Sequence, residues 1–298
     1  MELHQLRYFA AVADLGSFTK AAERCDVAQP SLSQQIIKLE RELRQPLFER
    51  LGRSIRLTEA GRTLYSHAVE VLRSVDEIRD RVAAATDPEA ATVNIGAIPT
   101  IAPYLLPPLL RAFARRRPRA TVTLQENLTD FTIRGCLEGD LDVGVIASDP
   151  QHELLDGTAL FTEELLLAMP RRHRLSRKRR ITWDQIAEEP FVLMNEMHCL
   201  GEQIVGFCKQ QGGLPPVRCR SVQLLTIQEL VSQGYGVSLV PAMAREMDRG
   251  RKCEYRSLAD PRPTRTIRLI WHKHRYRSPP AEEFVCLAKE AAAGGSDG

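Results

Sequence analysis

The sequence predicts an α/β protein in three parts: an N-terminal winged helix-turn-helix, a long linker helix and a two-lobed effector domain. Residues 1–58 read as short amphipathic helices followed by a small hairpin, and residues 59–82 carry one long apolar stripe. From Thr92 onward, short apolar runs alternate with helical patterns, as is typical of α/β folds. With 298 residues, 43% hydrophobic and 27% charged, the chain is neither disordered nor a disulfide-rich miniprotein.

The N-terminal part has the pattern of a helix-turn-helix. An apolar stripe predicts a first helix that ends at Gly16, and Ser17 or Thr19 can cap a second. Pro30 suits the first turn of a third helix, where its missing N–H costs nothing. The apolar residues of this third helix share one face: Leu32, Ile36, Leu39 and Leu43. Residues 47–56 alternate around a glycine and predict a small β-wing.

A long amphipathic helix begins at residues 58–61. Its apolar residues repeat with near-heptad spacing: Leu64, Ala68, Val71, Leu72, Val75, Ile78 and Val82. Because this stripe has no core of its own, we expect it to pair with a second copy of the helix. The alternative is a helix lying on the surface of its own domain. Residues 83–91, which include Pro88, read as a helix stop and linker.

The remainder predicts a mostly parallel sheet with helices between its strands. The expected strands are residues 93–97, 121–126, 141–147, 164–169, 191–194, 217–221, 237–241 and 266–271. About 200 residues exceed one small doubly wound unit, and the chain leaves and re-enters its first half. We therefore expect two lobes with a cleft, as in periplasmic binding proteins. The predicted parts are residues 1–58 (DNA-binding), 59–90 (linker) and 91–298 (effector), with lobe I at about 91–161 plus 268–298 and lobe II at about 162–267.

Bulk properties exclude a membrane protein but do not identify a partner. The net charge is +3, from 41 basic and 38 acidic residues, which by itself does not indicate nucleic acid. No apolar run approaches the ~18–20 residues of a membrane span, and residues 1–18 lack the pattern of a signal peptide. Seven irregularly spaced cysteines fit a reducing compartment, so we expect a cytoplasmic protein. No pattern indicates a metal or a cofactor, since His272 and His274 lack a third ligand.

Several motifs resemble the LysR-type transcriptional regulators. In the N-terminal part these are residues 18–23 (FTKAAE), 27–36 (VAQPSLSQQI), 39–40 (LE), 46–50 (PLFER) and 57–61 (LTEAG); in the effector part they are 139–145 (GDLDVGV) and 231–241 (VSQGYGVSLVP). The resemblance covers essentially the whole chain. It implies a regulator that binds double-stranded promoter DNA, forms a homodimer or homotetramer and works with RNA polymerase.

The third helix is the expected DNA-reading element, because short polar groups near the start of such a helix reach base edges in the major groove. The candidate reading residues are Gln29, Ser31, Ser33 and Gln34, with Pro30 fixing the helix start. Gln34 can pair bidentately with an adenine. Cations on the helix flank and the wing can reach phosphates: Lys38, Arg50, Arg53 and Arg56. Taken singly, each arginine is more often just a solvated surface charge, but the pattern as a whole favours phosphate contact.

Cys199 and Cys208 lie nine positions apart in the effector part. They can be separate core thiols, or metal ligands, although zinc sites use shorter gaps and no second pair lies nearby. They can also be a redox pair. If residues 200–208 are helical, the two positions are ~13.5 Å apart along the axis, whereas a disulfide needs Cα atoms within roughly 7 Å. Forming the bond must therefore unwind the helix, and such a two-state element is what a switch requires.

The same segment resembles the peroxide-sensing (OxyR) branch of the LysR-type regulators, in which His-Cys-Leu followed by Gly-Phe-Cys carries the sensing pair. The resemblance implies that Cys199 is the peroxidatic thiol and Cys208 the resolving thiol. It also implies that Thr100 and Thr129 line a peroxide pocket beside His198. The plain alternatives are a surface histidine and two threonines that cap helices.

The chemistry requires a thiolate, because only the thiolate attacks the peroxide O–O bond. Sulfenic acid at Cys199 then condenses with Cys208 and releases water, and a thiol reductant must reset the pair. Two positions depart from the branch: Met197 stands where it usually has Gly, which crowds the pocket, and Gly201 stands where it usually has Arg, which removes a positive charge near the thiol.

We therefore predict a DNA-binding regulator, not an enzyme, that senses hydrogen peroxide through a thiol–disulfide switch and changes its DNA-binding geometry. The first alternative is a regulator of the same class that binds a small organic anion in the cleft, with incidental cysteines. The second is a thiol peroxidase, for which residues 1–58 would serve no purpose. The third is a periplasmic-type solute-binding protein, against which the DNA-binding part argues.

Overall fold

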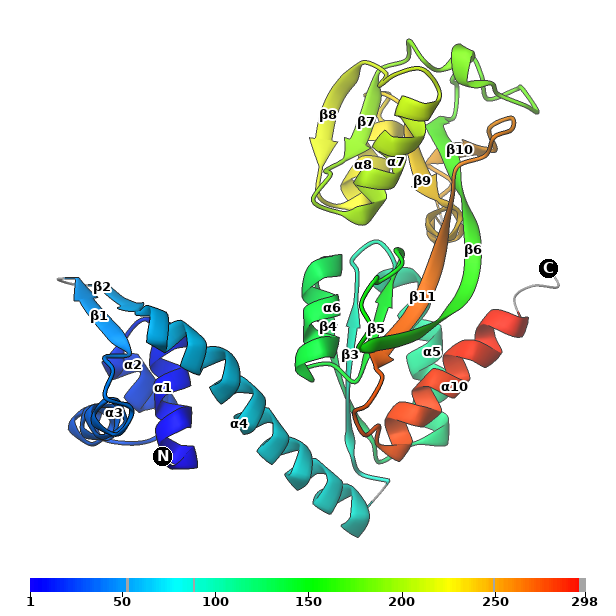
Figure 1. Cartoon of the computed structure of the whole chain (residues 1–298). Helices are drawn as coiled ribbons and strands as arrows, with labels where there is room; N and C mark the ends of the chain where they lie inside the picture. The colour runs from blue at the N-terminus through cyan, green and yellow to red at the C-terminus, as the bar shows by residue number, and fades with distance from the viewer. Residues whose placement is uncertain (52–53, 88, 249, 295–298) are drawn as a thin grey trace. The chain divides into compact units, whose positions relative to one another are not determined.

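The computed structural model describes residues 1–51, 54–87, 89–248 and 250–294 (Figure 1). The chain divides into two compact units, residues 1–83 and 84–298. No helix in the described ranges is both long enough and apolar enough to cross a membrane.

The N-terminal unit is a winged helix-turn-helix followed by a long helix. Its elements are α1 (Leu3–Leu15), α2 (Phe18–Arg24), α3 (Gln29–Leu43), the antiparallel pair β1 (Phe48–Leu51) and β2 (Ser54–Leu57), and α4 (Glu59–Thr86). The Ser17 hydroxyl caps α2 by accepting the N–H of Lys20, as predicted. The buried face of α3 holds Leu32, Ile36 and Leu39, but Leu43 at the helix end is exposed, which corrects the predicted stripe.

The apolar stripe of α4 is buried at one end of the helix and mostly exposed along the rest. Ala68 is buried in the core of the winged helix-turn-helix, whereas Val71, Ile78 and Val82 are exposed. An apolar stripe left open along a helix of 28 residues is the surface that a paired helix would cover.

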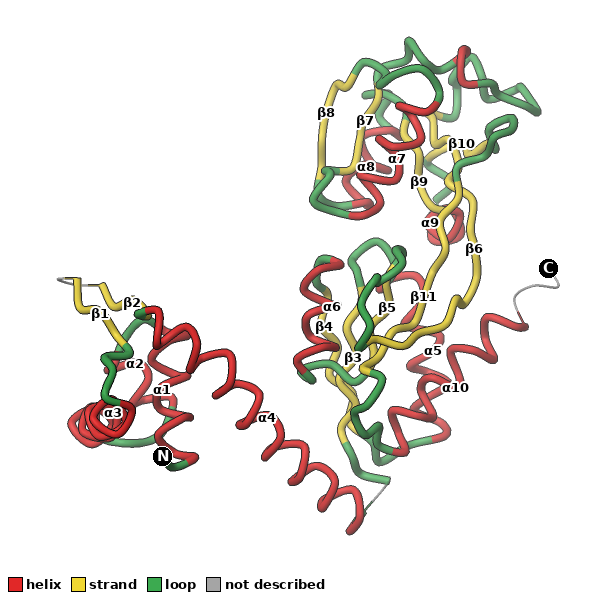
Figure 2. The backbone as a smooth tube through the Cα atoms, in the orientation of Figure 1, coloured by secondary structure: helices red, strands yellow, loops and turns green. Residues whose placement is uncertain are grey.

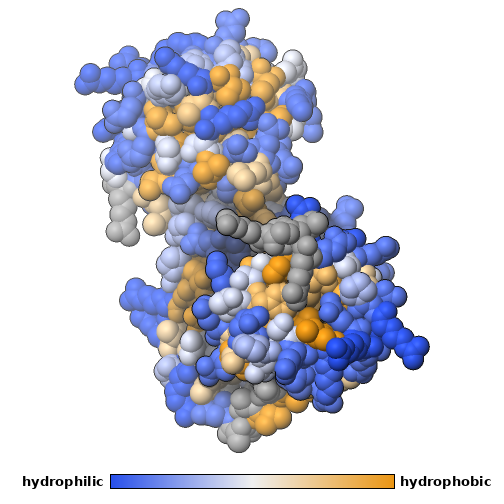
Figure 3. Space-filling view, turned by 90° about the vertical axis from the view of Figure 1, so that its left-hand side faces the viewer, coloured by the Kyte–Doolittle hydropathy of each residue, from blue (hydrophilic) through white to orange (hydrophobic). Residues whose placement is uncertain are grey.

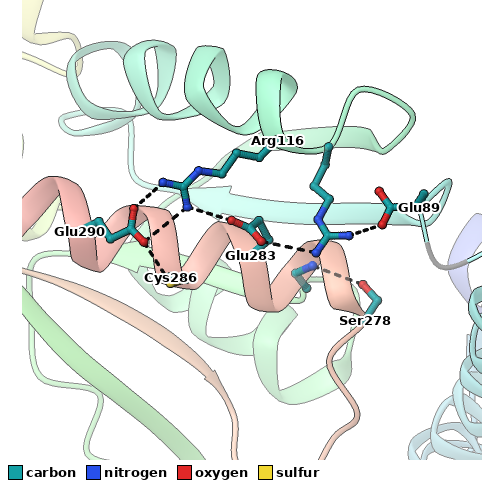
Figure 4. Close-up of polar contacts among 8 residues, drawn as sticks. Glu89, Arg116, Ser278, Glu283, Cys286 and Glu290 are labelled. Carbon is teal, nitrogen blue, oxygen red and sulfur yellow. Dashed lines mark hydrogen bonds and ion pairs between the residues drawn. The ribbon is translucent and has the colours of Figure 1, made fainter.

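The first lobe of the effector unit is built on three parallel strands: β3 (Thr92–Ala97), β4 (Thr121–Glu126) and β5 (Val143–Ile146). The helices α5 (Ala102–Arg116), α6 (Thr129–Glu138) and α10 (Pro279–Gly294) accompany this sheet. Arg116, the last residue of α5, pairs with Glu283 and Glu290 of α10, as Figure 4 shows. The next residue, Arg117, pairs with Glu283 and also with Glu89, which precedes β3. These ion pairs fix the C-terminal helix against the first lobe.

The second lobe has its own core and its own strands. Its elements are η1 (Trp183–Gln185), β7 (Phe191–Met194), α7 (Cys199–Gln210), β8 (Val217–Ser221), α8 (Leu224–Ser232), β9 (Ser238–Pro241), α9 (Ala242–Met247) and β10 (Cys253–Arg256). Strands β7 and β8 are parallel. On the face seen in Figure 3, hydrophilic residues predominate over this upper lobe, with small hydrophobic patches among them.

Two long strands connect the lobes. Figures 1 and 2 show β6 (Leu155–Pro170) and β11 (Thr264–His272) running side by side from one lobe to the other. They pair antiparallel with each other, and β6 continues into antiparallel pairs with β9 and β10. The lobe boundaries expected near residues 161 and 267 fall inside these strands.

The sheet is mixed, so the prediction of a mostly parallel sheet is wrong. The chain crosses between the lobes and returns on neighbouring strands, which makes the crossing pair antiparallel. The predicted strand at 164–169 is only the end of β6, and the sequence analysis did not predict β10 or α9. The errors in the strands share one cause: pairings between strands far apart in the chain leave little local signal.

Candidate functional site

The exposed face of α3 presents the predicted DNA-reading residues. Gln29, Pro30, Ser31, Gln34 and Lys38 are exposed, and Ser33 is half-buried. The helix begins at Gln29, so that Pro30 lies in its first turn as predicted. Since Leu32, Ile36 and Leu39 occupy the opposite face, the polar set is free to meet a ligand.

The wing contributes one described cation. Arg56 lies on β2 and is exposed, opposite Glu49 of β1. Arg50 lies on β1 opposite Ile55, but its side chain lies outside what the structure describes, as does the whole of Arg53.

Helix α7 holds the two cysteines of the predicted pair apart. Cys199 is the first residue of α7 and Cys208 lies near its end, and both thiols are free. Cys199 is half-buried and packs against the hydrophobic core of the first lobe, whereas Cys208 is fully buried in the core of the second. Nine helical positions separate them by ~13.5 Å along the axis, well beyond disulfide distance.

The two thiols differ in burial and therefore in reactivity. Burial raises the pKa of Cys208 to about 11, so this thiol is protonated at neutral pH and is a poor nucleophile. Cys199, at the start of α7, is only half-buried and is therefore the more accessible of the two thiols.

His198 precedes α7 as its N-terminal capping residue, and it is only 8% exposed. The interpretation as a surface histidine is therefore wrong. Burial lowers the pKa of His198, so its ring is neutral at pH 7. Next to Cys199 in the chain, His198 therefore contributes no positive charge.

Thr100 and Thr129 follow the carboxyl ends of two neighbouring parallel strands, β3 and β4. Thr100 is buried, and its hydroxyl oxygen accepts a hydrogen bond of 3.0 Å from Arg265. The Thr129 hydroxyl oxygen is buried and has no hydrogen-bond partner among the described residues. Neither threonine caps a helix, because Ile101 and Leu128 hold those positions, so the interpretation as N-caps is wrong.

Gln203, which the sequence analysis missed, ties α7 to the first lobe. It lies one turn after Cys199, and its side-chain nitrogen donates to the carbonyl of Ala147 at 2.6 Å, at the carboxyl end of β5. Its side-chain oxygen is buried without a partner in the part of the chain that the structure describes. Gln203 therefore reaches the carboxyl end of β5, and Thr129 follows the carboxyl end of β4 in the same sheet. A buried oxygen without a partner can accept a hydrogen bond from a small bound molecule.

A buried ion pair that was not predicted from the sequence contacts Thr100, just beyond the carboxyl end of β3. Arg265 on β11 and Glu163 on β6 face each other at 2.8 Å, with side chains 0% and 6% exposed. Arg265 also donates to the hydroxyl and carbonyl oxygens of Thr100, and Glu163 accepts the backbone N–H of Met243 at the start of α9. Since Arg265 occupies a lone pair of the Thr100 hydroxyl, the hydroxyl hydrogen is left to donate elsewhere. The only signal in the sequence was a charged residue at an inward position of each strand.

The two units together define a DNA-binding regulator with a separate sensory domain. Residues 3–62 match the family described as bacterial regulatory helix-turn-helix protein, lysR family, and residues 86–293 match the LysR substrate binding domain. The chain therefore belongs to the LysR family of transcriptional regulators, which are regulators and not enzymes.

Its relatives include proteins of one functional branch. The chain is 34% identical to the hydrogen peroxide-inducible genes activator of Pectobacterium carotovorum subsp. carotovorum, over 91% of this chain and 90% of that protein. It is 33% identical to the DNA-binding transcriptional dual regulator OxyR of Escherichia coli (strain K12), over 97% and 94%. A full-length OxyR variant of Pseudomonas aeruginosa has a similar solved structure, with a TM-score of 0.74, 31% identity and coverage of 98% and 94%.

Removing one partner of the buried ion pair should destabilise the protein. Arg265→Met leaves the Glu163 carboxylate buried without its cation, so we expect the free energy of unfolding to fall by about 3–5 kcal/mol. Urea unfolding of the full chain measures it. Adding Glu163→Leu to Arg265→Met should recover most of the loss, and a double variant no more stable than the single one would contradict this account.

Gly201 should tolerate no side chain, because a Cβ there would lie 2.4 Å from the Asn195 carbonyl oxygen. We expect Gly201→Ala to lower the free energy of unfolding by about 1–3 kcal/mol through overpacking. Gly206 is the matched control on the same helix, since a Cβ there meets nothing within 4 Å. Gly206→Ala should be neutral or stabilise by up to about 1 kcal/mol. Equal effects of the two substitutions in urea unfolding would refute the packing argument.

Proposed function

We propose that this protein is a peroxide-sensing transcription regulator whose switch is the Cys199–Cys208 pair. The observation that carries the proposal is the placement of the pair on one intact helix, with one thiol against each lobe's core. Joining the sulfurs requires α7 to unwind, and unwinding removes a contact from both lobes. The names of the relatives from P. carotovorum and E. coli support the same function.

The first step is attack of the Cys199 thiolate on one peroxide oxygen. The O–O bond breaks, Cys199 becomes a sulfenic acid and hydroxide leaves, taking a proton to form water. In this proposal the Thr100 hydroxyl, whose oxygen already accepts from Arg265, donates its hydrogen to peroxide, and the unpartnered oxygens of Thr129 and Gln203 accept from it. The ring of His198 is the proposed proton carrier for this step.

The second step joins the sulfurs. The Cys208 thiol displaces the sulfenic oxygen, which leaves as water, and the disulfide forms. Cys208 must first leave its buried position, so α7 unwinds and the hydrogen bond from Gln203 to Ala147 is lost. A dithiol reductant returns both cysteines to thiols and allows the helix to re-form.

The response is a change in the geometry of the DNA contacts. Pairing through α4 makes a dimer, and pairing of effector units makes a tetramer with several DNA-reading helices. Repacking of the lobes changes how subunits meet, and therefore which half-site spacing on promoter DNA they fit. RNA polymerase is the partner through which this change reaches transcription.

A second candidate function rests on a pocket between the lobes. Its volume is about 630 Å³, and its walls include Thr100 and Tyr104 of the first lobe and Leu224, Gln228 and Lys252 of the second. Cys199 and Thr129 do not line it. An organic co-inducer could bind there, and calorimetry against metabolite mixtures distinguishes this function from thiol chemistry.

Peroxide should oxidise two thiols. We expect free thiols to fall from seven to five in the parent chain at low peroxide, and not to fall in Cys199→Ser. Cys286→Ser is the control: Cys286 is exposed, but its hydrogen bond to Glu290 raises its pKa, so its removal should leave the two-thiol loss intact. Thiol counting with a chromogenic disulfide measures both, and loss that persists in Cys199→Ser would exclude the proposed switch.

Substitutions of Gln34 and Arg56 should distinguish a residue that reads bases from one that contacts phosphates. Gln34→Ala should weaken binding to a selected operator about 10–100-fold and leave binding to random duplex nearly unchanged. Arg56→Ala should weaken both alike and reduce the slope of log K against log salt by about 0.9. Fluorescence anisotropy over a salt series measures both, and a Gln34→Ala protein that loses affinity for the two duplexes equally would not be missing a base contact.

A further inference from the structure

Residues 171–180 form the most concentrated charge in the molecule, with seven cations and no carboxylate in ten positions. The whole chain carries only +3, so that the residues outside this run together carry −4. We name this run the basic loop. It lies between β6 and β7, and Figures 1 and 2 show this segment at the end of the second lobe that is remote from the first.

The basic loop is an ordered scaffold. Leu175 is buried in the core of the second lobe, and Ile181 just beyond the loop is buried too. Turns close within the loop: Ser176 N–H donates to the carbonyl of His173 at 2.9 Å, and Lys178 N–H to that of Leu175 at 3.0 Å. Arg256 of β10 donates to the Ser176 carbonyl at 2.8 Å. The cations are therefore displayed from a fixed backbone.

Most of these cations are unneutralised. Arg174 is paired with Glu189 at 2.7 Å. The other six are exposed and make no ion pair or side-chain hydrogen bond with any described residue: Arg171, Arg172, Arg177, Lys178, Arg179 and Arg180. Mutual repulsion of six free cations is an energetic cost that an external polyanion would relieve.

The composition of the basic loop selects the class of polyanion. Its one large apolar side chain, Leu175, points into the core, so the loop offers no apolar anchor for a membrane or for the centre of a protein interface. Five of the six free cations are arginines, whose planar guanidinium matches phosphate in two parallel hydrogen bonds. The chain already holds a DNA-reading unit, which raises the local concentration of duplex phosphates around its other surfaces.

We propose that the basic loop binds the phosphate backbone of duplex DNA as a second, sequence-independent contact of this regulator. It adds affinity without reading bases, because no side chain in the loop other than cations, His173 and Ser176 is available to a groove. This contact belongs to the effector unit and does not depend on the proposed thiol chemistry.

The test is neutralisation in the full-length protein. The variant R177Q/K178Q/R179Q/R180Q removes four exposed charges that support nothing in the fold. With a long random-sequence duplex as the probe, we expect the slope of log K against log salt to fall by about 2–4 and the affinity at low salt to fall at least tenfold. Peroxide-dependent thiol loss should be unchanged, so failure here and failure of the switch are separate results.

A matched control has the same change in net charge. R111Q/R115Q/R245Q/K273Q also removes three arginines and one lysine from other parts of the effector unit; all four are exposed and make no ion pair with a described residue. Its slope should change by less than about one. The proposal is overturned if the two variants give the same slope and affinity for duplex DNA. It is equally overturned if the loop variant loses affinity only for single-stranded RNA or for an acidic protein.

Discussion

The rise of an α-helix, 1.5 Å per residue, is the constraint on which the sensory unit depends. It places Cys199 at the junction of the lobes and Cys208 inside the second lobe, and it keeps the sulfurs apart for as long as α7 exists. The same helix carries Gln203, whose amide reaches across to the first lobe. With both cysteines as thiols, α7 thus contributes to the packing of two cores, and unwinding α7 would destabilise both.

The two strands that cross between the lobes, β6 and β11, hold elements of both lobes in place. Strands β6 and β11 place Glu163 and Arg265 face to face in the interior, where removing either charge alone would be costly. The pair orients Thr100 of the first lobe and the start of α9 in the second. The Glu163–Arg265 pair therefore holds elements of both lobes in place through contacts that do not involve α7.

Local rules predicted the elements whose signals lie within a few residues. The spacing of Leu32, Ile36 and Leu39 gave α3 and its exposed polar face, and Pro30 marked its start. The helix across Cys199 and Cys208 was only a condition of the disulfide argument, and the structure forms it as α7. The mixed sheet, the burial of His198, and the roles of Gln203 and Arg265 did not follow from local rules, because each depends on a partner far away in the chain: Ala147 for Gln203 and Glu163 for Arg265. Spacing within a segment carries no information about such pairs.

The energetics of α7 set how readily such a pair oxidises. A cross-link over ~10 residues is worth about 2.7 kcal/mol in the chain-entropy description. Against it stand the helical hydrogen bonds that must open, each worth about 0.5–1.5 kcal/mol net, and the burial of the Cys208 side chain. Because the folded helix stabilises the dithiol form, each 1.4 kcal/mol of helix stability raises the reduction potential of the pair by about 30 mV. The close packing of Gly201 on Asn195 adds to that stability. For the proposed switch, the oxidation threshold therefore depends on the packing of α7 as well as on the reactivity of its first residue.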